Sequence, residues 1–220
     1  MPRKNLRSVG GKPLIAWSVE LGKQAVWSGL VTRAIVSTDD REIADAARAA
    51  GGDVPFMRPA ELADDKAKMA PVLRHAVLEI EAADGVRFDW VLLLQATSPL
   101  RTLDDLRSAV ELAAEGGTDS VISVVQVFDT HPVLMKKIEG DRLVPFCVPE
   151  PEGTRRQDYQ PAAYMRNGAI YLTRRDVLVE RGSIWGDSIR PYVMPEERSL
   201  SVDTELHIKM LDQILGEHPR

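Results

Sequence analysis

The sequence contains one cysteine, Cys147, among its 220 residues. An internal disulfide and a cluster of thiolate metal ligands are therefore both excluded, and a reducing cytoplasm is the expected setting. No apolar run approaches the roughly 20 residues that a helix needs to cross a bilayer. The polar residues at the start are not followed by the apolar stretch of a signal peptide. We therefore expect a cytoplasmic protein with no membrane partner.

Basic residues are also in the minority, because 28 Lys and Arg stand against 33 Asp and Glu and give a net charge of -5. A general nucleic-acid binder needs a basic face to neutralise phosphates, so no nucleic-acid partner is expected. A local basic pocket for a small anion remains compatible with this balance. The length suits a single domain, residues 1–220, with room for a substantial core and an appended arm.

Short apolar segments alternate with helical patterns along the chain. The predicted strands are residues 31–37, 54–57, 90–94, 120–127 and 169–173, and the predicted helices are 41–50, 102 to about 116, and 205–215. The last helix has an apolar face of Leu206, Met210, Leu211 and Ile214. Repeated strand, loop and helix units indicate an α/β fold with a mainly parallel sheet and helices on both faces.

Residues at about 129–165 break this rhythm. The segment 136–143 has the pattern of a β-hairpin with Gly140 and Asp141 near its turn, and four prolines make the remainder irregular. A long irregular insert in a compact domain is usually functional or an interaction element.

Two polar loops follow predicted strands. Residues 95–101 (QATSPLR) follow one strand, and residues 38–40 (TDD) follow another. In open parallel sheets ligands bind at the carboxyl ends of the strands, so both loops are candidates for contact with a polar ligand. Thr38 or Asp39 could equally cap the next helix, whereas Gln95 is a poor cap and favours a binding role.

Basic residues gather in three places, at residues 3–5 (RKN), 155–157 (RRQ) and 166–168 (RNG). They could form a focused anion site or simply be scattered surface charge. Asp203, just before the last predicted helix, could bind Mg²⁺ together with phosphate oxygens, or could cap the helix that starts at Glu205.

Six segments together form a recognisable set: 2–6 (PRKNL), 11–15 (GKPLI), 37–44 (STDDREIA), 93–101 (LLQATSPLR), 167–171 (NGAIY) and 201–206 (SVDTEL). They span nearly the whole chain, and LLQATSPLR with RNGAIY and VDTEL is the most specific combination. In these segments and in their order the sequence resembles the acylneuraminate cytidylyltransferase family.

This resemblance implies a three-layer, Rossmann-like nucleotidyltransferase fold and a homodimer, in which a dimerisation arm at about 129–165 reaches the partner's sugar site. It implies that the anomeric hydroxyl of an acidic nine-carbon sugar, such as legionaminic or pseudaminic acid, attacks the α-phosphate of CTP. The products would be a CMP-sugar and pyrophosphate, with Mg²⁺ as cofactor.

By position, the resemblance also implies roles for individual residues. The contacts to triphosphate and cytidine would come from Lys4 and Asn5, the sugar contact from Gln95, and the metal ligand would be Asp203. Arg156 and Arg166 would bind either the carboxylate of the sugar or the phosphates of the nucleotide. The remaining binding residues would be Ser98, Arg101 and Asn167, and Tyr171 would pack below the site.

Three departures from the family pattern matter. Relatives carry a strand and a glycine-rich nucleotide loop before PRKN, whereas this sequence begins at Met1. Ser201 stands where relatives often have a second Asp, and Arg166 lies directly before Asn167. One hypothesis is a start at an internal Met of a full enzyme. Another is a catalytically impaired relative that serves as a binding or dimeric scaffold, and a third is a related transferase for another nucleotide or a keto-deoxy-octonic acid.

Overall fold

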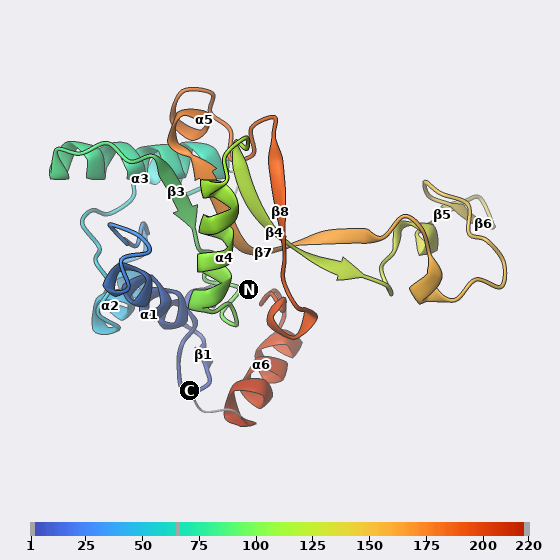
Figure 1. Cartoon of the computed structure of the whole chain (residues 1–220). Helices are drawn as coiled ribbons and strands as arrows, with labels where there is room; N and C mark the ends of the chain where they lie inside the picture. The colour runs from blue at the N-terminus through green and yellow to red at the C-terminus, as the bar shows by residue number, and fades with distance from the viewer. Residues whose placement is uncertain (1–2, 65–66, 218–220) are drawn as a thin grey trace.

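The computed structural model describes residues 3–64 and 67–217 of the chain (Figure 1). The helices are α1 (Leu14–Trp27), α2 (Arg41–Ala49), α3 (Met69–Asp84), α4 (Leu103–Ala114), α5 (Arg175–Val179) and α6 (Glu205–Glu217). The strands are β1 (Ser8–Val9), β2 (Lys12–Pro13), β3 (Trp90–Leu93), β4 (Ser120–Val127), β5 (Lys136–Glu139), β6 (Arg142–Pro145), β7 (Ala163–Arg174) and β8 (Ile189–Val193). Short 3₁₀ helices are η1 (Lys4–Leu6), η2 (Ala60–Leu62), η3 (Pro132–Leu134), η4 (Arg156–Asp158) and η5 (Glu196–Arg198).

The central sheet has the strand order β3-β7-β4-β8. β7 runs antiparallel to both β3 and β4, and β4 runs parallel to β8. The α/β class is therefore confirmed, but the sheet is mixed instead of mainly parallel. The reason lies in the insert, which leaves β4 at Val127 and returns at the paired residue Ala163, so that β7 must run back along β4.

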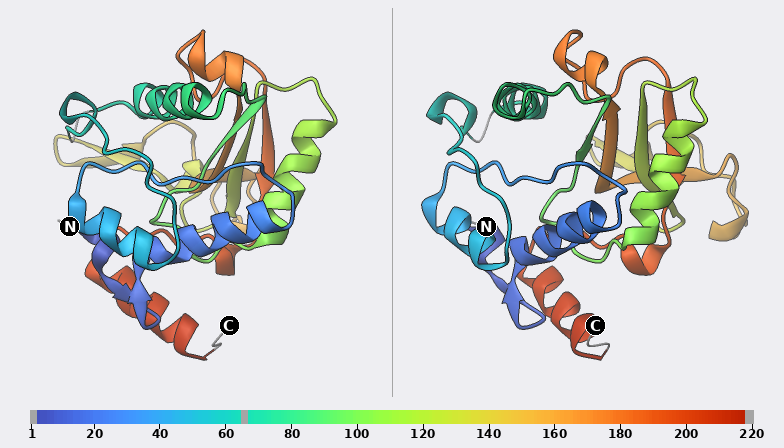
Figure 2. Two further views of the ribbon diagram at one scale, coloured as in Figure 1. Left: turned by 90° about the vertical axis from the view of Figure 1, so that its left-hand side faces the viewer. Right: turned by 60° about the vertical axis from the view of Figure 1, so that its left-hand side comes forward.

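Helices cover the sheet on two sides. The main core is made by α1 and α4 against the sheet, with Leu21 and Leu106 packed together with Val121 and Leu172. Figure 2 shows α3 on the side of the sheet opposite α4, which gives the expected three layers. No helix among residues 3–64 and 67–217 is long and apolar enough to cross a membrane.

Residues 31–37 and 54–57 do not form the predicted strands. All residues of 31–37 are at least partly exposed, and the Val36 amide donates to the carbonyl of Asp53, directly before the second segment, at 2.8 Å. β3 is likewise half-buried along its whole length instead of buried on both faces. A strand forms only where a neighbouring backbone continues the ladder. Within the described part of the chain, β3 pairs on one edge alone, with β7.

The residues that begin α4 and α2 agree with the sequence prediction in one case and differ from it in the other. Thr102 begins α4 in a reciprocal capping box with Asp105, as its position predicted. The cap of α2 is Asp40, whose carboxylate accepts bonds from the amides of Glu42 and Ile43 at 2.8 and 3.3 Å. The expected caps, Thr38 and Asp39, were therefore wrong by one or two positions.

The predicted apolar face of α6 is also only partly buried. Leu211 is buried together with Ile208 and Leu215, whereas Leu206, Met210 and Ile214 are exposed. The buried side is fixed by packing against β1 and the loop before α4, which local periodicity does not reveal.

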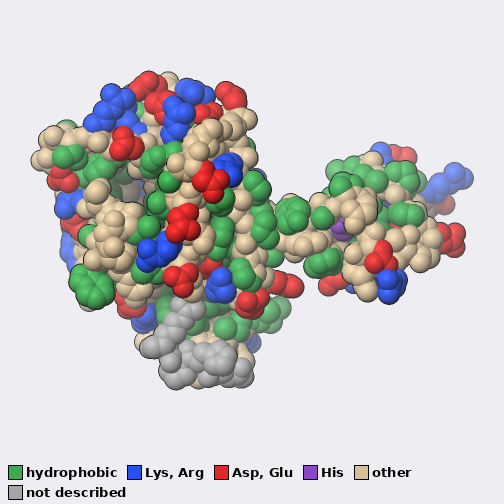
Figure 3. All heavy atoms as spheres, viewed as in Figure 1, with side chains coloured by type: hydrophobic (Ala, Val, Ile, Leu, Met, Phe, Trp, Pro, Cys, Tyr) green, Lys and Arg blue, Asp and Glu red, His purple; other side chains and the backbone are tan. Residues whose placement is uncertain are grey.

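The insert projects from the body as an arm (Figure 1). Its hairpin is confirmed, since β5 pairs antiparallel with β6 from Lys136↔Pro145 to Glu139↔Arg142. Large apolar side chains are exposed along it, and Figure 3 shows them gathered on its surface. They include Met135, Ile138, Leu143, Phe146, Tyr164 and Met165.

Candidate active site

The loop that follows β3 is tied to the segment before α6. The amide of Val202 donates to the carbonyl of Thr97 at 2.8 Å, and Val202 is completely buried. This bond brings Asp203 beside the polar loop 95–101. Nζ of Lys4 lies 3.1 Å from Oδ1 of Asp203, so the first described residues also reach this place. Three segments that are distant in sequence therefore meet at the carboxyl end of β3.

The carboxylate of Asp203 is not the cap of α6. The hydroxyl oxygen of Thr204 accepts the bond from the amide of His207 at 3.3 Å, which leaves the Asp203 side chain 63% exposed and paired with Lys4. Of the two interpretations that the sequence left open, the structure excludes the cap.

Gln95 lies against the backbone of Gly168. A Cβ atom at Gly168 would stand 2.8 Å from Oε1 of Gln95, and the φ of Gly168 is +75°. Both observations require glycine here, because other residues disfavour this φ and a side chain would push Gln95 away. The contact brings the RNG segment next to the loop after β3, as the resemblance implied.

Arg101 is buried and fully engaged by its terminal nitrogens. Nη1 donates to the carbonyls of Gln95, Ser98 and Ala169 at 2.7, 2.9 and 3.2 Å, and Nη2 donates to the hydroxyl of Ser18 at 2.6 Å. Burial lowers the pKa of Arg101 to about 9, which still leaves the group charged at neutral pH. The guanidinium thus holds the Gln95 loop against β7.

Asn167 and Ser98 are buried beside it. Oδ1 of Asn167 accepts bonds from the hydroxyl of Ser123 at 2.6 Å and the amide of Ala169 at 3.2 Å, and Nδ2 donates to Ser199 at 3.0 Å. The hydroxyl of Ser98 donates to the Asn167 carbonyl at 3.4 Å. These residues build the floor under Gln95, and direct contacts of theirs with a substrate stay a prediction.

The remaining predicted residues are spread more widely. Arg166 is exposed, and its guanidinium lies 4.2 Å from the ring centre of Trp185. Asn5 lies in η1 with a half-exposed side chain near Lys4. Arg156 belongs to η4 on the arm, where it pairs with Asp129 at 2.7 Å, and the arm carries it away from the body (Figure 1).

Two residues beside these were not identified from the sequence. Trp185 comes from an irregular loop with no pattern around it. Arg58 donates to Asp39 at 2.6 Å, and its amide donates to the Thr38 carbonyl at 2.8 Å. Its buried Nε has no partner in the described part of the chain. Arg58 stands in no motif, so no sequence signal marked it.

Asp203 is the candidate metal ligand. Among the residues that the structure describes, no group of three or more His, Cys, Asp or Glu side chains could hold a metal ion. A single accessible carboxylate does fit Mg²⁺, which keeps several waters and takes its other ligands from substrate phosphates. The hydroxyl of Ser201 would add at most a weak ligand.

Asp203 and Arg166 are exposed to solvent, and Lys4 and Gln95 are partly exposed. Two pockets lie elsewhere, one along α3 lined by Arg74 and His75, and one at the base of the arm lined by Gln126 and Met194. Neither is lined by Lys4, Gln95, Arg166 or Asp203. The contacts described above are what join Lys4 and Asp203 to the loop after β3.

The architecture is that of a nucleotidyltransferase. A solved structure of CMP:2-keto-3-deoxy-manno-octonic acid synthetase complexed with CTP superposes with a TM-score of 0.69 at 18% identity, covering 99% of this chain and 93% of that one. This likeness shows the fold.

The sequence matches the family described as Cytidylyltransferase over residues 1–179, and the chain belongs to that family. It is 31% identical over 214 residues to the post-translational flagellin modification protein B of Campylobacter coli, covering 97% of this chain and 88% of the relative. It is 32% identical over 213 residues to the CMP-N,N'-diacetyllegionaminic acid synthase of Campylobacter jejuni, with 97% and 88% coverage. The expected nucleotidyltransferase is thereby confirmed.

Proposed function

We propose that the protein transfers CMP from CTP to a nonulosonic acid, an acidic nine-carbon sugar of the sialic-acid type, and releases pyrophosphate in the cytoplasm. The observation that carries the proposal is the meeting of Lys4, Gln95 and Asp203 at the carboxyl end of β3. The relative from Campylobacter jejuni, named as a synthase of a CMP-linked acid of this type, supports the choice of substrates.

In this reaction the anomeric hydroxyl oxygen forms a bond to the α-phosphorus of CTP. The bond from that phosphorus to the oxygen bridging to the β-phosphate breaks, pyrophosphate leaves, and the hydroxyl proton passes to solvent. Lys4 would neutralise charge on the triphosphate beside Asn5, and Gln95 would hydrogen-bond the sugar. Arg166 offers a planar fork of donors that matches a carboxylate.

Mg²⁺, when bound, would supply further neutralisation of the phosphate charge and orient the phosphate oxygens. Asp203 is the residue that would hold it, with the phosphate oxygens and water as the other ligands. Lys4 pairs with this carboxylate at 3.1 Å, and this proximity supports the proposal that both groups act on the same phosphates.

The test is turnover by the gene product, purified with every in-frame residue that its gene encodes. It would be mixed with Mg²⁺, each of the four nucleoside triphosphates, and N-acetylneuraminic, N,N'-diacetyllegionaminic or pseudaminic acid. Keto-deoxy-octonic acid serves as the eight-carbon control. We expect pyrophosphate release and a CMP-sugar mass with CTP and a nine-carbon acid. Binding of CTP without release by any acid would refute the enzyme proposal and support the scaffold hypothesis.

We also propose that the arm joins two copies of the chain, as the resemblance implied. Ile138 and Leu143 of the β5–β6 hairpin are 77% and 70% exposed and lie among the other exposed apolar side chains of the arm, and such groups of exposed apolar residues mark interaction sites. Arg156 on the same arm would then reach the partner's site. Sedimentation should show a dimer that Ile138→Glu with Leu143→Glu dissociates. Val86→Glu, at an exposed apolar residue outside the arm, is the matched control.

A further inference from the structure

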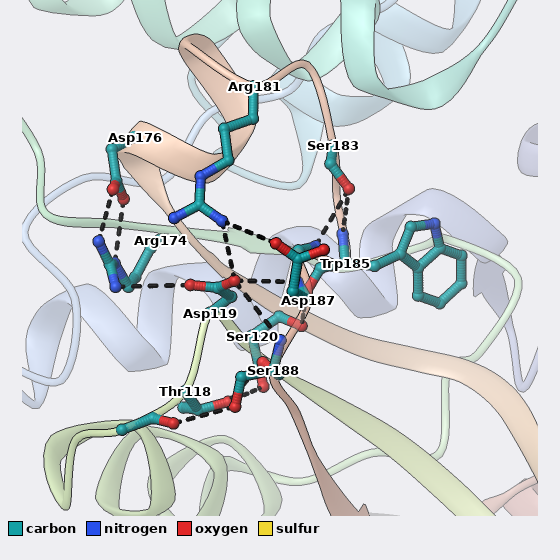
Figure 4. Close-up of polar contacts among 12 residues, drawn as sticks. Thr118, Asp119, Ser120, Arg174, Asp176, Arg181, Ser183, Trp185, Asp187 and Ser188 are labelled. Carbon is teal, nitrogen blue, oxygen red and sulfur yellow. Dashed lines mark hydrogen bonds and ion pairs between the residues drawn. The ribbon is translucent and has the colours of Figure 1, made fainter.

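A carboxylate outside the candidate site organises the loop between α5 and β8. The side chain of Asp119, directly before β4, is only 10% exposed. It accepts bonds from the amides of Asp187 and Ser188 at 2.9 and 3.5 Å, and Nη1 of Arg181 lies 3.1 Å away. Figure 4 shows this carboxylate at the centre of the polar contacts.

The same loop is held by its carbonyl groups. The hydroxyl of Thr173 donates to the Ile184 carbonyl at 2.8 Å, and the hydroxyl of Ser120 donates to the Trp185 carbonyl at 2.6 Å. Within the loop, the hydroxyl oxygen of Ser183 accepts bonds from the amides of Trp185 and Gly186, both at 3.1 Å. The backbone around Trp185 therefore has little freedom.

Gly186 allows the carboxylate to come this close. Its φ is +68°, and a Cβ atom there would overlap the Asp119 side chain. The amide of Asp187 is the main reason that the pKa of Asp119 lies below its ordinary value, so the carboxylate stays charged at neutral pH. The charged carboxylate of Asp119 and the absence of a side chain at Gly186 together allow the loop to take this conformation.

What this loop presents is the indole of Trp185. In Figure 4 the indole points away from the carboxylate network. Its ring centre lies 5.8 Å from that of Tyr171 in an edge-on contact and 4.2 Å from the guanidinium carbon of Arg166. Within residues 3–64 and 67–217, no carboxylate pairs with Arg166, so the indole is the contact that orients this cation while its charge stays available to an anion.

We propose that Asp119 is a positioning residue for the acidic substrate: it fixes the Ser183–Ser188 loop so that Trp185 holds the guanidinium of Arg166 ready for the carboxylate of the sugar. This inference rests on the proposed function. The physical reason is that an arginine side chain has many rotamers. Ordering the side chain before the substrate binds reduces the conformational entropy that is lost on binding. A cation over an aromatic face provides such ordering without neutralising the charge.

The first experiment uses Asp119→Asn, which keeps the shape but places an amide NH₂ against the donors around it. We expect KM for the sugar acid to rise about tenfold, in the range that a lost cation–π contact gives, with KM for CTP unchanged within about twofold. Asp176→Asn is the matched control, because Asp176 pairs with Arg174, as Asp119 does, but does not bond the Ser183–Ser188 loop. An Asp119→Asn enzyme with an unchanged KM for the sugar acid would overturn the proposal.

A double-mutant cycle separates positioning from general damage. Trp185→Ala should raise KM for the sugar acid by a similar factor, and adding Asp119→Asn to it should have little further effect, because both act through the same contact. If the factor by which KM rises in the double variant equals the product of the two single-variant factors, Asp119 acts through another contact and the inference is refuted. Should Asp119→Asn fail to fold, Gly186→Ala displaces the same loop and takes its place in the cycle.

A spectroscopic experiment tests the positioning role of Asp119 even if no sugar acid is turned over. Four tryptophans can be labelled as 5-fluorotryptophan and the Trp185 resonance assigned with Trp185→Phe. We expect ¹⁹F NMR to show this resonance shifted in both Asp119→Asn and Arg166→Ala, with Trp17 and Trp27 unmoved. An unmoved Trp185 resonance in Asp119→Asn sinks the positioning role. If the resonance moves but no sugar acid is turned over, the proposed function is refuted and the positioning role of Asp119 is kept.

Discussion

Replacing Asp105 by Asn should be among the most destabilising single changes outside the active site. Its carboxylate is fully buried and accepts five bonds from three residues. Arg198 donates twice, at 2.7 and 3.2 Å, the hydroxyl of Tyr192 donates at 2.8 Å, and Thr102 donates through its amide at 2.7 Å and its hydroxyl at 2.9 Å. The residue therefore joins the start of α4 to β8 and η5.

The magnitude follows from the partner that is left behind. Removing one member of a buried ion pair costs about 3–5 kcal/mol, and loss of the capping box adds about 1 kcal/mol that is not strictly additive. The side chain of Arg198 is 29% exposed and can turn toward water, which favours the lower end. We expect a loss of about 3 kcal/mol, which for a domain of this size lowers Tm by about 6–12 °C.

Thermal and urea unfolding followed by circular dichroism would measure this loss. Glu115→Gln is the matched control, since Glu115 pairs with Arg190 at 2.7 Å on the surface and is 61% exposed. Exposed pairs of this kind contribute about 0–1 kcal/mol. If Asp105→Asn and Glu115→Gln lower the free energy of unfolding equally, the reasoning about the buried network is wrong.

Three further outcomes are expected. Burial by itself raises the pKa of the Asp105 carboxyl, but its donors outweigh burial and hold that pKa below the ordinary value. Its contribution to stability is thus present above about pH 3.9 and is lost as the pH falls through the lower folded pKa, so unfolding of Asp105→Asn at pH 2–5 should depend less on pH. Asp203→Ala should lower kcat and weaken the dependence of activity on Mg²⁺, and an unchanged Mg²⁺ titration would remove that residue from the metal site. Gln95→Ala should mainly raise KM for the sugar. Gly168→Ala should destabilise the fold by about 1–3 kcal/mol through its positive φ and raise KM for the sugar by displacing Gln95, and wild-type values of both would contradict the geometry.

The elements that the sequence predicted well are those whose causes are local. Thr102 with Asp105 three positions later is a complete capping signal, and α4 begins where it indicates. The apolar run 120–127 matches β4 residue for residue, and the β5–β6 hairpin lies where Gly140 and Asp141 placed its turn. The capping box and the hairpin depend on residues within one helical turn or one hairpin, whereas β4 forms because the more distant strands β7 and β8 pair with it.

The failures arose where a distant segment decides the outcome. Residues 31–37 have the composition of a buried strand, but pairing needs a neighbour that composition does not supply. Arg101 has the position of a ligand donor, and only the fold shows that its Nη1 donates to the Ser98 and Ala169 carbonyls; a substrate contact of Arg101 stays a prediction. The network around Asp119 joins residues that lie more than 50 positions apart, so no motif could have announced it.

The arm is, in topological terms, the loop of an oversized hairpin whose two legs are the central strands β4 and β7. It enters and leaves the sheet through one register pair, Val127↔Ala163. Insertions or deletions between these two positions can lengthen or shorten its reach while the strand that carries Arg166 and Gly168 keeps its place. The length of the arm can therefore vary in proteins built on this plan without moving the strand residues of the candidate site.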